Sequence, residues 1–280
     1  DVCSSDLVVR GVSNPFYTDI IQAIEKTVTD AGFSLVMQQI PSCGDEVQRA
    51  AIMEREKRLQ GIIFLGGRLD YSPEDLAMLN VPYVCCSYSN QYGTLRIGEY
   101  SAVSIADEEA AQQAVDHLYG HGHRRIAALI CRPDDQSISQ LRYQGYCKAL
   151  SSHGIPLDPE LVMCAGSFDI RDAYDAVCEK LRQGAEFTAL FAIADSMAIG
   201  AMRALRDEGR AVPQDCSVIA IDGLELSAYI EPPLTTLCQP MEEMGQRSAQ
   251  ILLGLIHGHG AHCCEVLPTR LRQGGSVQDI

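Results

Sequence analysis

The sequence has few basic residues for its length. Its 280 residues include 22 Lys and Arg against 37 Asp and Glu, which gives a formal net charge of −15 at pH 7. A surface of this charge repels a polyanion. We therefore expect that this chain does not bind duplex DNA by itself at physiological salt. A gel shift that showed tight, salt-sensitive binding would contradict this expectation.

Long apolar runs are also missing. No segment approaches the ~20 apolar residues of a membrane helix, so no membrane partner is expected. The first residues lack the basic region and the apolar stretch of a signal peptide. The opening segment Asp1–Leu7 is what a sequencing-adapter DNA string encodes on translation, and we interpret residues 1–7 as a non-native leader. Resequencing the locus tests this interpretation, and native codons there would refute it.

The sequence contains none of the common motifs of catalytic or nucleotide-binding sites. There is no GxGxxG after a strand, no P-loop, no HExxH and no GxSxG. We therefore predict that the chain is not an enzyme, that it has no catalytic residues and that it needs no cofactor.

The twelve cysteines form no CxxC pair, and several stand in apolar, strand-like runs, where cysteine behaves as a small hydrophobe. We interpret them as reduced thiols of a cytoplasmic protein. One Gly-rich tract after a helix has the composition of a metal site, but an exposed loop is the simpler interpretation, so no metal is predicted. The tract contains His257, His259, His262, Cys263 and Cys264.

Short β-rich runs alternate with amphipathic helical patterns along the chain, which is typical of α/β proteins with parallel sheets. The pattern begins again near Gly120–Arg125. A lone late helix through Met244–Leu255, followed by strands near Val266 and Leu271, suits a chain that crosses back between two lobes. Strands are expected at residues 7–9, 35–37, 61–65, 82–86, 102–105, 126–130, 161–163, 188–193, 217–221 and 235–237.

The predicted fold class is therefore α/β, with two Rossmann-like parallel-sheet lobes joined by three crossovers and a ligand cleft between them. The N-terminal lobe is expected to comprise residues 8–122 plus 239–265. The C-terminal lobe is expected to comprise residues 123–238 plus 266–280.

Several short motifs occur in a fixed order along this pattern. They are Asn14-Pro15-Phe16-Tyr17, Gly61-Ile62-Ile63, Gly122-His123-Arg124-Arg125-Ile126-Ala127, Arg142-Tyr143-Gln144-Gly145-Tyr146, Asp195-Ser196-Met197-Ala198-Ile199-Gly200-Ala201, Val212-Pro213-Gln214-Asp215-Cys216-Ser217-Val218 and Pro232-Pro233-Leu234-Thr235-Thr236. Taken together, they make the sequence resemble the LacI-type (lactose/galactose repressor) family, which shares the periplasmic-binding-protein-like fold.

The resemblance implies the effector-sensing core of a DNA-binding transcriptional regulator, a repressor. It further implies a sugar or sugar derivative as the effector, a homodimer, and operator DNA as the partner of an N-terminal helix-turn-helix. Nothing before Val8 could form that helix-turn-helix, so it is absent from this chain. The alternative is a periplasmic solute-binding protein of a sugar transporter, which predicts a signal peptide and few free thiols.

Ligands of open α/β sheets bind beyond the carboxyl ends of the strands. Phe16 suits stacking on an apolar ligand face, although it could instead pack inward as a helix-start staple. Arg142 offers a rigid donor fork, with a surface salt bridge as the alternative. Asp222 ends an apolar strand and could accept two hydroxyl hydrogen bonds, or cap the next turn.

Two further ligand contacts, Phe168 and Gln239, are implied by the family positions alone. Asp195 begins a helix and is expected to act as its N-cap. The chain departs from the family at Ala194, at Ser87-Tyr88 and at Gly66-Gly67-Arg68. Arg68 and Tyr88 could replace the lost pyranose contacts, which would favour a ligand with an anionic or aromatic part.

Overall fold

The computed structural model describes the backbone of residues 3–10 and both backbone and side chains of residues 15–40 and 45–280. The chain forms two compact units, residues 1–105 with 240–267 (unit 1) and residues 106–239 with 268–280 (unit 2). It passes between them three times, at 105–106, 239–240 and 267–268. The prediction of two parallel-sheet units joined by three crossings is confirmed. The motif residue Asn14 lies outside the described residues.

Unit 1 is built around a six-stranded parallel sheet. From edge to edge its strands are β11 (Cys264–Leu267), β5 (Ala102–Ile105), β4 (Tyr83–Cys86), β3 (Ile62–Leu65), β1 (Cys3–Arg10) and β2 (Phe33–Ile40). Its helices are α1 (Tyr17–Asp30), α2 (Glu46–Lys57), the short α3 (Pro73–Leu76) and α8 (Met241–Ile256). β3 and β5 are buried at every position, as expected for strands that helices cover on both faces.

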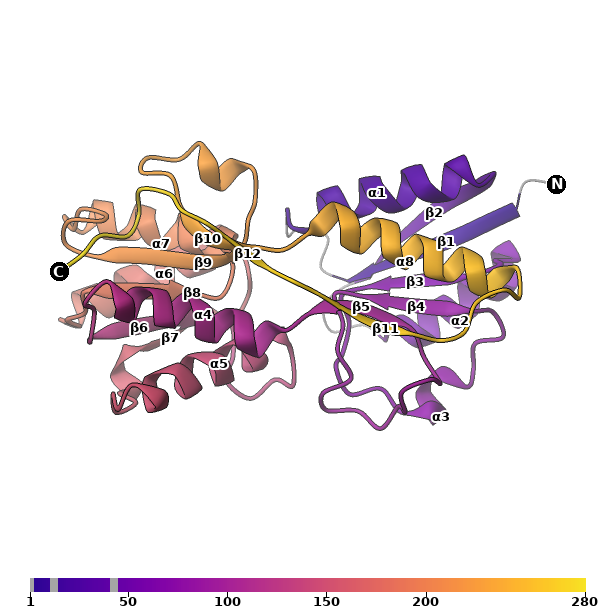
Figure 1. Ribbon diagram of the computed structural model, residues 1–280, viewed down its shortest axis with the longest axis horizontal. Helices are drawn as coiled ribbons and strands as arrows, with labels where there is room; N and C mark the ends of the chain where they lie inside the picture. The colour runs from indigo at the N-terminus through magenta and orange to yellow at the C-terminus, as the bar shows by residue number, and fades with distance from the viewer. Residues whose placement is uncertain (1–2, 11–14, 41–44) are drawn as a thin grey trace. The chain divides into compact units, whose positions relative to one another are not determined.

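Helices α1 and α8 pack side by side over the sheet of unit 1 (Figure 1). The buried face of α1 consists of Ile20, Ala23, Ile24 and Val28, a helical spacing that the sequence pattern already indicates. A Cβ atom on Gly245 of α8 would lie 2.5 Å from the carbonyl oxygen of Ile20. Only glycine allows the two helices to approach this closely.

Unit 2 repeats the same order of strands. Its sheet runs β12 (Arg270–Arg272), β10 (Thr235–Cys238), β9 (Ser217–Asp222), β8 (Ala189–Ala192), β6 (Ile126–Ile130) and β7 (Val162–Cys164), and only β12 is antiparallel to its neighbour among these strands. The helices are α4 (Asp107–Gly120), α5 (Ile138–Ser152), α6 (Ile170–Arg182) and α7 (Asp195–Asp207). Helices α4 and α5 pack together, as do α6 and α7 (Figure 1).

The first crossing lies earlier in the chain than the boundary at residues 122–123 that the sequence suggests. Helix α4 belongs to unit 2, because it packs along α5 and against β8, β9 and β10. The apolar face of this helix is compatible with either sheet, so its sequence alone could not assign it.

In both sheets the strand order reverses beside the first strand, between β1 and β3 in unit 1 and between β6 and β8 in unit 2. Side chains beyond the carboxyl ends of the strands at such switch points are the first candidates for ligand contacts. In unit 2, Arg132 and Ile193 follow β6 and β8. Asp222 is the last residue of β9, and Gln239 follows β10.

Candidate functional site

A buried guanidinium lies at the carboxyl edge of the unit 2 sheet. Arg142 is 3% exposed, and its Nε donates to Asp107 Oδ1 at 2.8 Å. Its Nη1 donates to the carbonyl oxygen of Ile193 at 2.5 Å and to Asp222 Oδ1 at 3.3 Å. One buried cation is therefore shared by two buried carboxylates, and the predicted alternative of a surface salt bridge is wrong.

The packing of two helices brings this cluster together. Helix α5 begins after Ser137, whose hydroxyl accepts from the Ser139 N–H at 3.0 Å as an N-cap. Gly145, three residues after Arg142, lies against α4, where a Cβ would come within 2.2 Å of the carbonyl oxygen of Glu108. Glycine at this position therefore lets α5 approach the first turn of α4, where Asp107 is the first helical residue.

Asp222 and Gln239 form the acceptor side of the site. Gln239 Nε2 donates to Asp222 Oδ1 at 2.9 Å, and the Gln239 N–H donates to the Asp222 carbonyl oxygen at 2.9 Å. The remaining oxygens, Asp222 Oδ2 and Gln239 Oε1, are buried and accept no hydrogen bond from the described residues. Few buried polar atoms in proteins are left without a partner, so two neighbouring ones call for an explanation.

The backbone at Asp222 is held in a rare conformation. Its φ is +141°, within the region that favours glycine, and the next residue, Gly223, also has a positive φ of +83°. A Cβ on Gly223 would lie 2.6 Å from the side chain of Cys238. Strained backbone of this kind concentrates at binding and catalytic sites, where the surrounding structure holds it in place.

Burial dominates the electrostatics of the site. It raises the pKa of Asp222 from 3.8 to about 7, although Arg142 acts in the opposite direction. It also raises the pKa of Asp107, again against the effect of Arg142. Burial opposes the charge on Arg142, but Asp107 and Asp222 more than offset it and raise the pKa of Arg142. The cluster is therefore well suited to accept hydrogen bonds and poorly suited to bind an anion.

The two predicted aromatic contacts lie at the carboxyl ends of their sheets. Phe168 is half-buried between β7 and α6, and its carbonyl oxygen accepts from Ser196 Oγ at 2.8 Å. Phe16 directly precedes α1, is 4% exposed, and meets the Tyr17 ring edge-on at 5.3 Å between centroids. The burial of Phe16 is also compatible with the inward packing considered as its alternative, and the roles of both residues as ligand contacts stay predictions.

The side chains of Arg68 and Tyr88 interact with other residues of unit 1. Arg68 lies 3.4 Å from Asp70 and 3.6 Å from Asp75, and its guanidinium stands 5.4 Å from the centre of the Tyr71 ring. Tyr88 is 2% exposed, stacks on Tyr71 at 5.4 Å, and its hydroxyl donates to Asn90 Oδ1 at 2.7 Å. The ligand roles predicted for Arg68 and Tyr88 stay predictions.

Comparison with known proteins settles the family. The profile of the periplasmic binding protein-like domain matches residues 115–277. The chain is 33% identical over 276 residues to the HTH-type transcriptional regulator MalR of Clostridium butyricum, which covers 98% of this chain and 82% of that protein. The structure of the lac repressor dimer bound to operator and the anti-inducer ONPF superposes with a TM-score of 0.85 at 25% identity, over 99% of this chain and 95% of that one. The chain belongs to the LacI family of transcriptional regulators.

A second solved structure of the LacI family is similar over nearly the whole chain. It is described as the complex of the transcriptional regulator CelR with cellobiose, and it superposes with a TM-score of 0.85 at 30% identity. The alignment covers 98% of this chain and 84% of the CelR chain. The resemblance that the motifs indicate is thus confirmed.

Asp107 was not predicted as a site residue of this LacI-family chain. The predicted N-cap role of Asp195 is wrong, because Asp195 is the first residue of α7 and the N-cap position is Ala194. Asp195 Oδ2 instead accepts from the N–H groups of Gly223 and Leu224 and from Ser227 Oγ, at 2.7–3.1 Å. Its Oδ1 accepts from Thr236 Oγ1 at 2.5 Å. This carboxylate fixes the loop that follows Asp222, and nothing in the local sequence distinguishes that role from an N-cap.

The Gly-rich histidine tract shows no metal-site geometry in the part of the chain that the structure describes, where no three His, Cys, Asp or Glu side chains are placed to share an ion. His262 Nδ1 lies 3.1 Å from Ser101 Oγ, and His257 Nδ1 lies 2.7 Å from the Leu253 carbonyl oxygen. The ten cysteines whose side chains the structure describes are all unpaired. Across residues 3–10, 15–40 and 45–280, no helix is long and apolar enough to cross a membrane.

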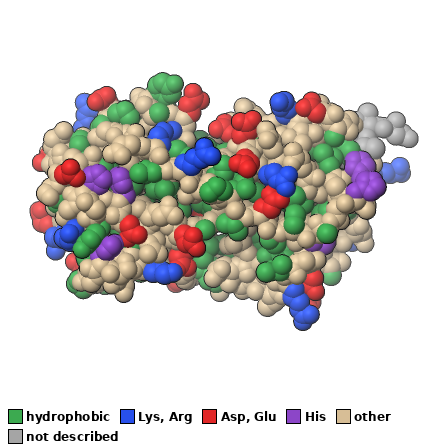
Figure 2. Space-filling model, viewed as in Figure 1, with side chains coloured by type: hydrophobic (Ala, Val, Ile, Leu, Met, Phe, Trp, Pro, Cys, Tyr) green, Lys and Arg blue, Asp and Glu red, His purple; other side chains and the backbone are tan. Residues whose placement is uncertain are grey.

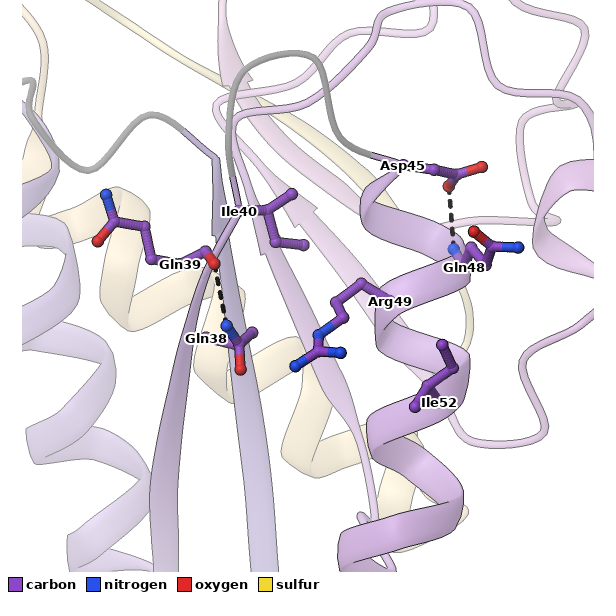
Figure 3. Close-up of a pocket in the computed structure, with 7 residues that line it drawn as sticks. All are labelled: Gln38, Gln39, Ile40, Asp45, Gln48, Arg49 and Ile52. Atoms are coloured by element: carbon purple, nitrogen blue, oxygen red, sulfur yellow. Dashed lines mark hydrogen bonds between the residues drawn. The ribbon is translucent and has the colours of Figure 1, made fainter.

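A separate pocket of about 440 Å³ lies in unit 1, between β2 and α2 (Figure 3). Its charged lining residues are Arg49 and Asp45, and Asp45 Oδ1 is already engaged as the N-cap of α2 through Val47 and Gln48. None of the predicted ligand residues lines it. We assign no role to this pocket.

The raised pKa of Asp222 predicts how stability depends on pH. The folded state holds a proton on Asp222 between about pH 4 and pH 7 that the unfolded chain releases, so the free energy of unfolding should fall as the pH rises through this range. Each unit of pKa difference corresponds to about 1.4 kcal/mol. Urea unfolding of the wild type and of Asp222→Asn at pH 5 and pH 8 measures this, and the variant should lose less stability between the two. An equal loss in both proteins would contradict the raised pKa.

Proposed function

We propose that this LacI-family core senses an uncharged, hydroxyl-rich effector, a sugar or sugar derivative, that donates hydrogen bonds to Asp222 Oδ2 and Gln239 Oε1. The observation that carries the proposal is that these two buried acceptors are left without donors by the described residues. A buried acceptor without a partner costs about 1–3 kcal/mol. Ligand hydroxyls would remove that cost, which favours binding.

The charges around the site support a neutral effector over an anionic one. Arg142 is already shared between Asp107 and Asp222, and Asp195 adds a third buried carboxylate whose charge further raises the pKa of Asp222. An anionic group here would meet like charges at short range and in a medium of low dielectric. The cellobiose named with the related CelR structure is a neutral sugar, which agrees with this preference.

We place the chain in the cytoplasm, as the core of a repressor that acts as a homodimer. The described lac repressor structure is a dimer bound to operator, and the MalR relative is named an HTH-type regulator. The chain has a net charge of −15, and on the face drawn in Figure 2 Lys and Arg side chains are interspersed with acidic ones. Because such a surface repels a polyanion, operator DNA is proposed to be bound by a helix-turn-helix, as the name of the MalR relative indicates for that protein. Phe16 and Phe168 are the proposed apolar contacts of the effector.

A thermal-shift screen of matched ligands tests this function. Neutral mono- and disaccharides should raise the melting temperature, whereas the corresponding sugar phosphates should not. A ligand at 100 times its dissociation constant adds about 2.7 kcal/mol of stability, which is easily detected. Stabilisation by the phosphates and not by the neutral sugars would overturn the proposal, and so would stabilisation of Asp222→Asn by the same sugars to the same extent.

A further inference from the structure

The first turn of α4 supplies a second carboxylate partner for Arg142. Asp107 is 8% exposed, and its Oδ1 accepts from Arg142 Nε at 2.8 Å. The bond from Arg142 Nη1 to Asp222 Oδ1 is longer, at 3.3 Å. The guanidinium is therefore held more closely by the carboxylate on α4 than by the carboxylate that faces the ligand.

Asp107 lies close to a point where the chain passes between the units. Ile105 is the last residue before the chain leaves unit 1, and Asp107 follows two residues later. On the other side of Arg142, Asp222 is bonded twice to Gln239, the last residue before the chain returns to unit 1. The Arg142 network thus ends at two of the three points where the chain passes between the units.

We propose that Asp107 is a positioning residue: through the shared Arg142, it controls how strongly Asp222 accepts hydrogen bonds from the effector. The proposal rests on the proposed function for the identity of the ligand class. The geometry on which it stands is a single buried guanidinium with two carboxylate partners, one of which, Asp222, has a buried oxygen, Oδ2, that accepts no hydrogen bond from the described residues.

The charged groups around Asp222 come from every element packed against it. Arg142 on α5 attracts it, Asp195 on α7 repels it, and Asp107 on α4 competes for Arg142. Arg272 of β12 lies 4.0 Å from Asp195 and partly balances that carboxylate. Burial raises the pKa of the nearby Cys131 thiol to about 12, so this group stays neutral near pH 7.

Removing the charge of Asp107 should lower the pKa of Asp222. In Asp107→Asn, Arg142 has one carboxylate partner instead of two, and its charge acts on Asp222 alone. This change favours the ionised form of Asp222 and lowers its pKa. The asparagine oxygen can still accept from Arg142 Nε, so the network keeps its geometry.

The first measurement needs no effector. Carboxyl-carbon NMR of aspartate-labelled protein follows the titration of Asp222, whose resonance is assigned by its absence in Asp222→Asn. The midpoint should fall by one pH unit or more in Asp107→Asn. The control is Glu108→Gln, which removes the same charge one residue later, from an exposed pair with Lys148 at 3.1 Å, and should leave the midpoint in place. A midpoint unchanged in Asp107→Asn would overturn the proposal even if that variant is less stable.

The second measurement uses a neutral sugar found in the thermal-shift screen. Because ionised Asp222 accepts hydrogen bonds better, wild-type affinity should rise roughly tenfold between pH 6 and pH 8, as expected for a group with a pKa near 7. In Asp107→Asn the rise should be less than about threefold, because at least about half of Asp222 is already ionised at pH 6. Identical pH profiles would contradict a positioning role. If no sugar binds the wild type, the proposed function fails, and the NMR titration still decides the role of Asp107.

Discussion

Replacing Arg142 with methionine should abolish effector binding and lower the free energy of unfolding at pH 8 by about 3–5 kcal/mol. Methionine keeps much of the apolar volume but leaves the carboxylates of Asp107 and Asp222, which are 8% and 2% exposed, without their shared cation. Urea unfolding measures the loss. At pH 5 it should be smaller, because burial already raises the pKa of both carboxyls and favours their neutral forms.

The matched control for Arg142→Met is Lys148→Met on the same helix. Lys148 is 61% exposed in its pair with Glu108, and exposed pairs of this kind contribute little. The control should therefore unfold nearly as the wild type does. A stability loss in Arg142→Met no larger than in Lys148→Met would show that the buried cluster does not carry the charges we assign to it.

Replacing Asp195 with alanine should lower the free energy of unfolding by at least about 3 kcal/mol. Four donors lose their acceptor in this variant, two of them backbone N–H groups of the loop after β9. That loop follows Asp222 directly, so effector affinity should also fall. Thermal unfolding and ligand titration of the purified variant measure both effects.

The control for Asp195→Ala is Asp207→Ala at the other end of α7. Asp207 pairs with Arg203 on the surface at 2.8 Å, and its loss should change stability and binding little. If Asp195→Ala retained wild-type affinity despite its lower stability, the loop after β9 would have no part in shaping the site.

The order of elements was predictable from the sequence because the signals are local. The buried strands are short apolar runs, and α1 shows its buried face as a 3.6-residue spacing through Ile20, Ile24 and Val28. The point where the chain first passes between units was not predictable in the same way. It depends on which sheet α4 packs against, and that is a long-range property.

The candidate site was predictable only in part, because its contacts also join residues that are far apart in the chain. Asp222 was found because it ends an apolar strand, and Arg142 because it lies in the N-terminal part of a helix. Their direct interaction was not predicted, since 80 positions separate them in the chain. Asp107 was missed, because a carboxylate in the first turn of a helix is usually explained by the helix dipole alone. Its contact with Arg142 depends on the close approach that Gly145 allows between α4 and α5.

Arg68 and Tyr88 show that the position of a residue after a strand does not predict the partners of its side chain. Both follow strands at the correct edge of their sheet, so their positions are those of ligand contacts. The tertiary structure gives each side chain other partners, in Asp70 and Asp75 for Arg68 and in Tyr71 and Asn90 for Tyr88. The position of a residue along a strand thus predicts at which edge of the sheet it lies. The partners of its side chain depend on residues that the local pattern does not specify.

The central claim is that Asp222 accepts hydrogen bonds from the effector. Isothermal titration of the wild type and of Asp222→Asn at pH 8, with a neutral sugar from the screen, tests it most directly. A charge-assisted bond becomes a neutral one, which weakens binding by about 1–2 kcal/mol, so affinity should fall roughly 5- to 30-fold. The control is Asp215→Asn, which makes the same change just before the amino end of β9, at an exposed carboxylate that accepts from the Ala211 N–H at 2.7 Å. The account predicts lower affinity in Asp222→Asn alone, whereas equal affinity in all three proteins would contradict it.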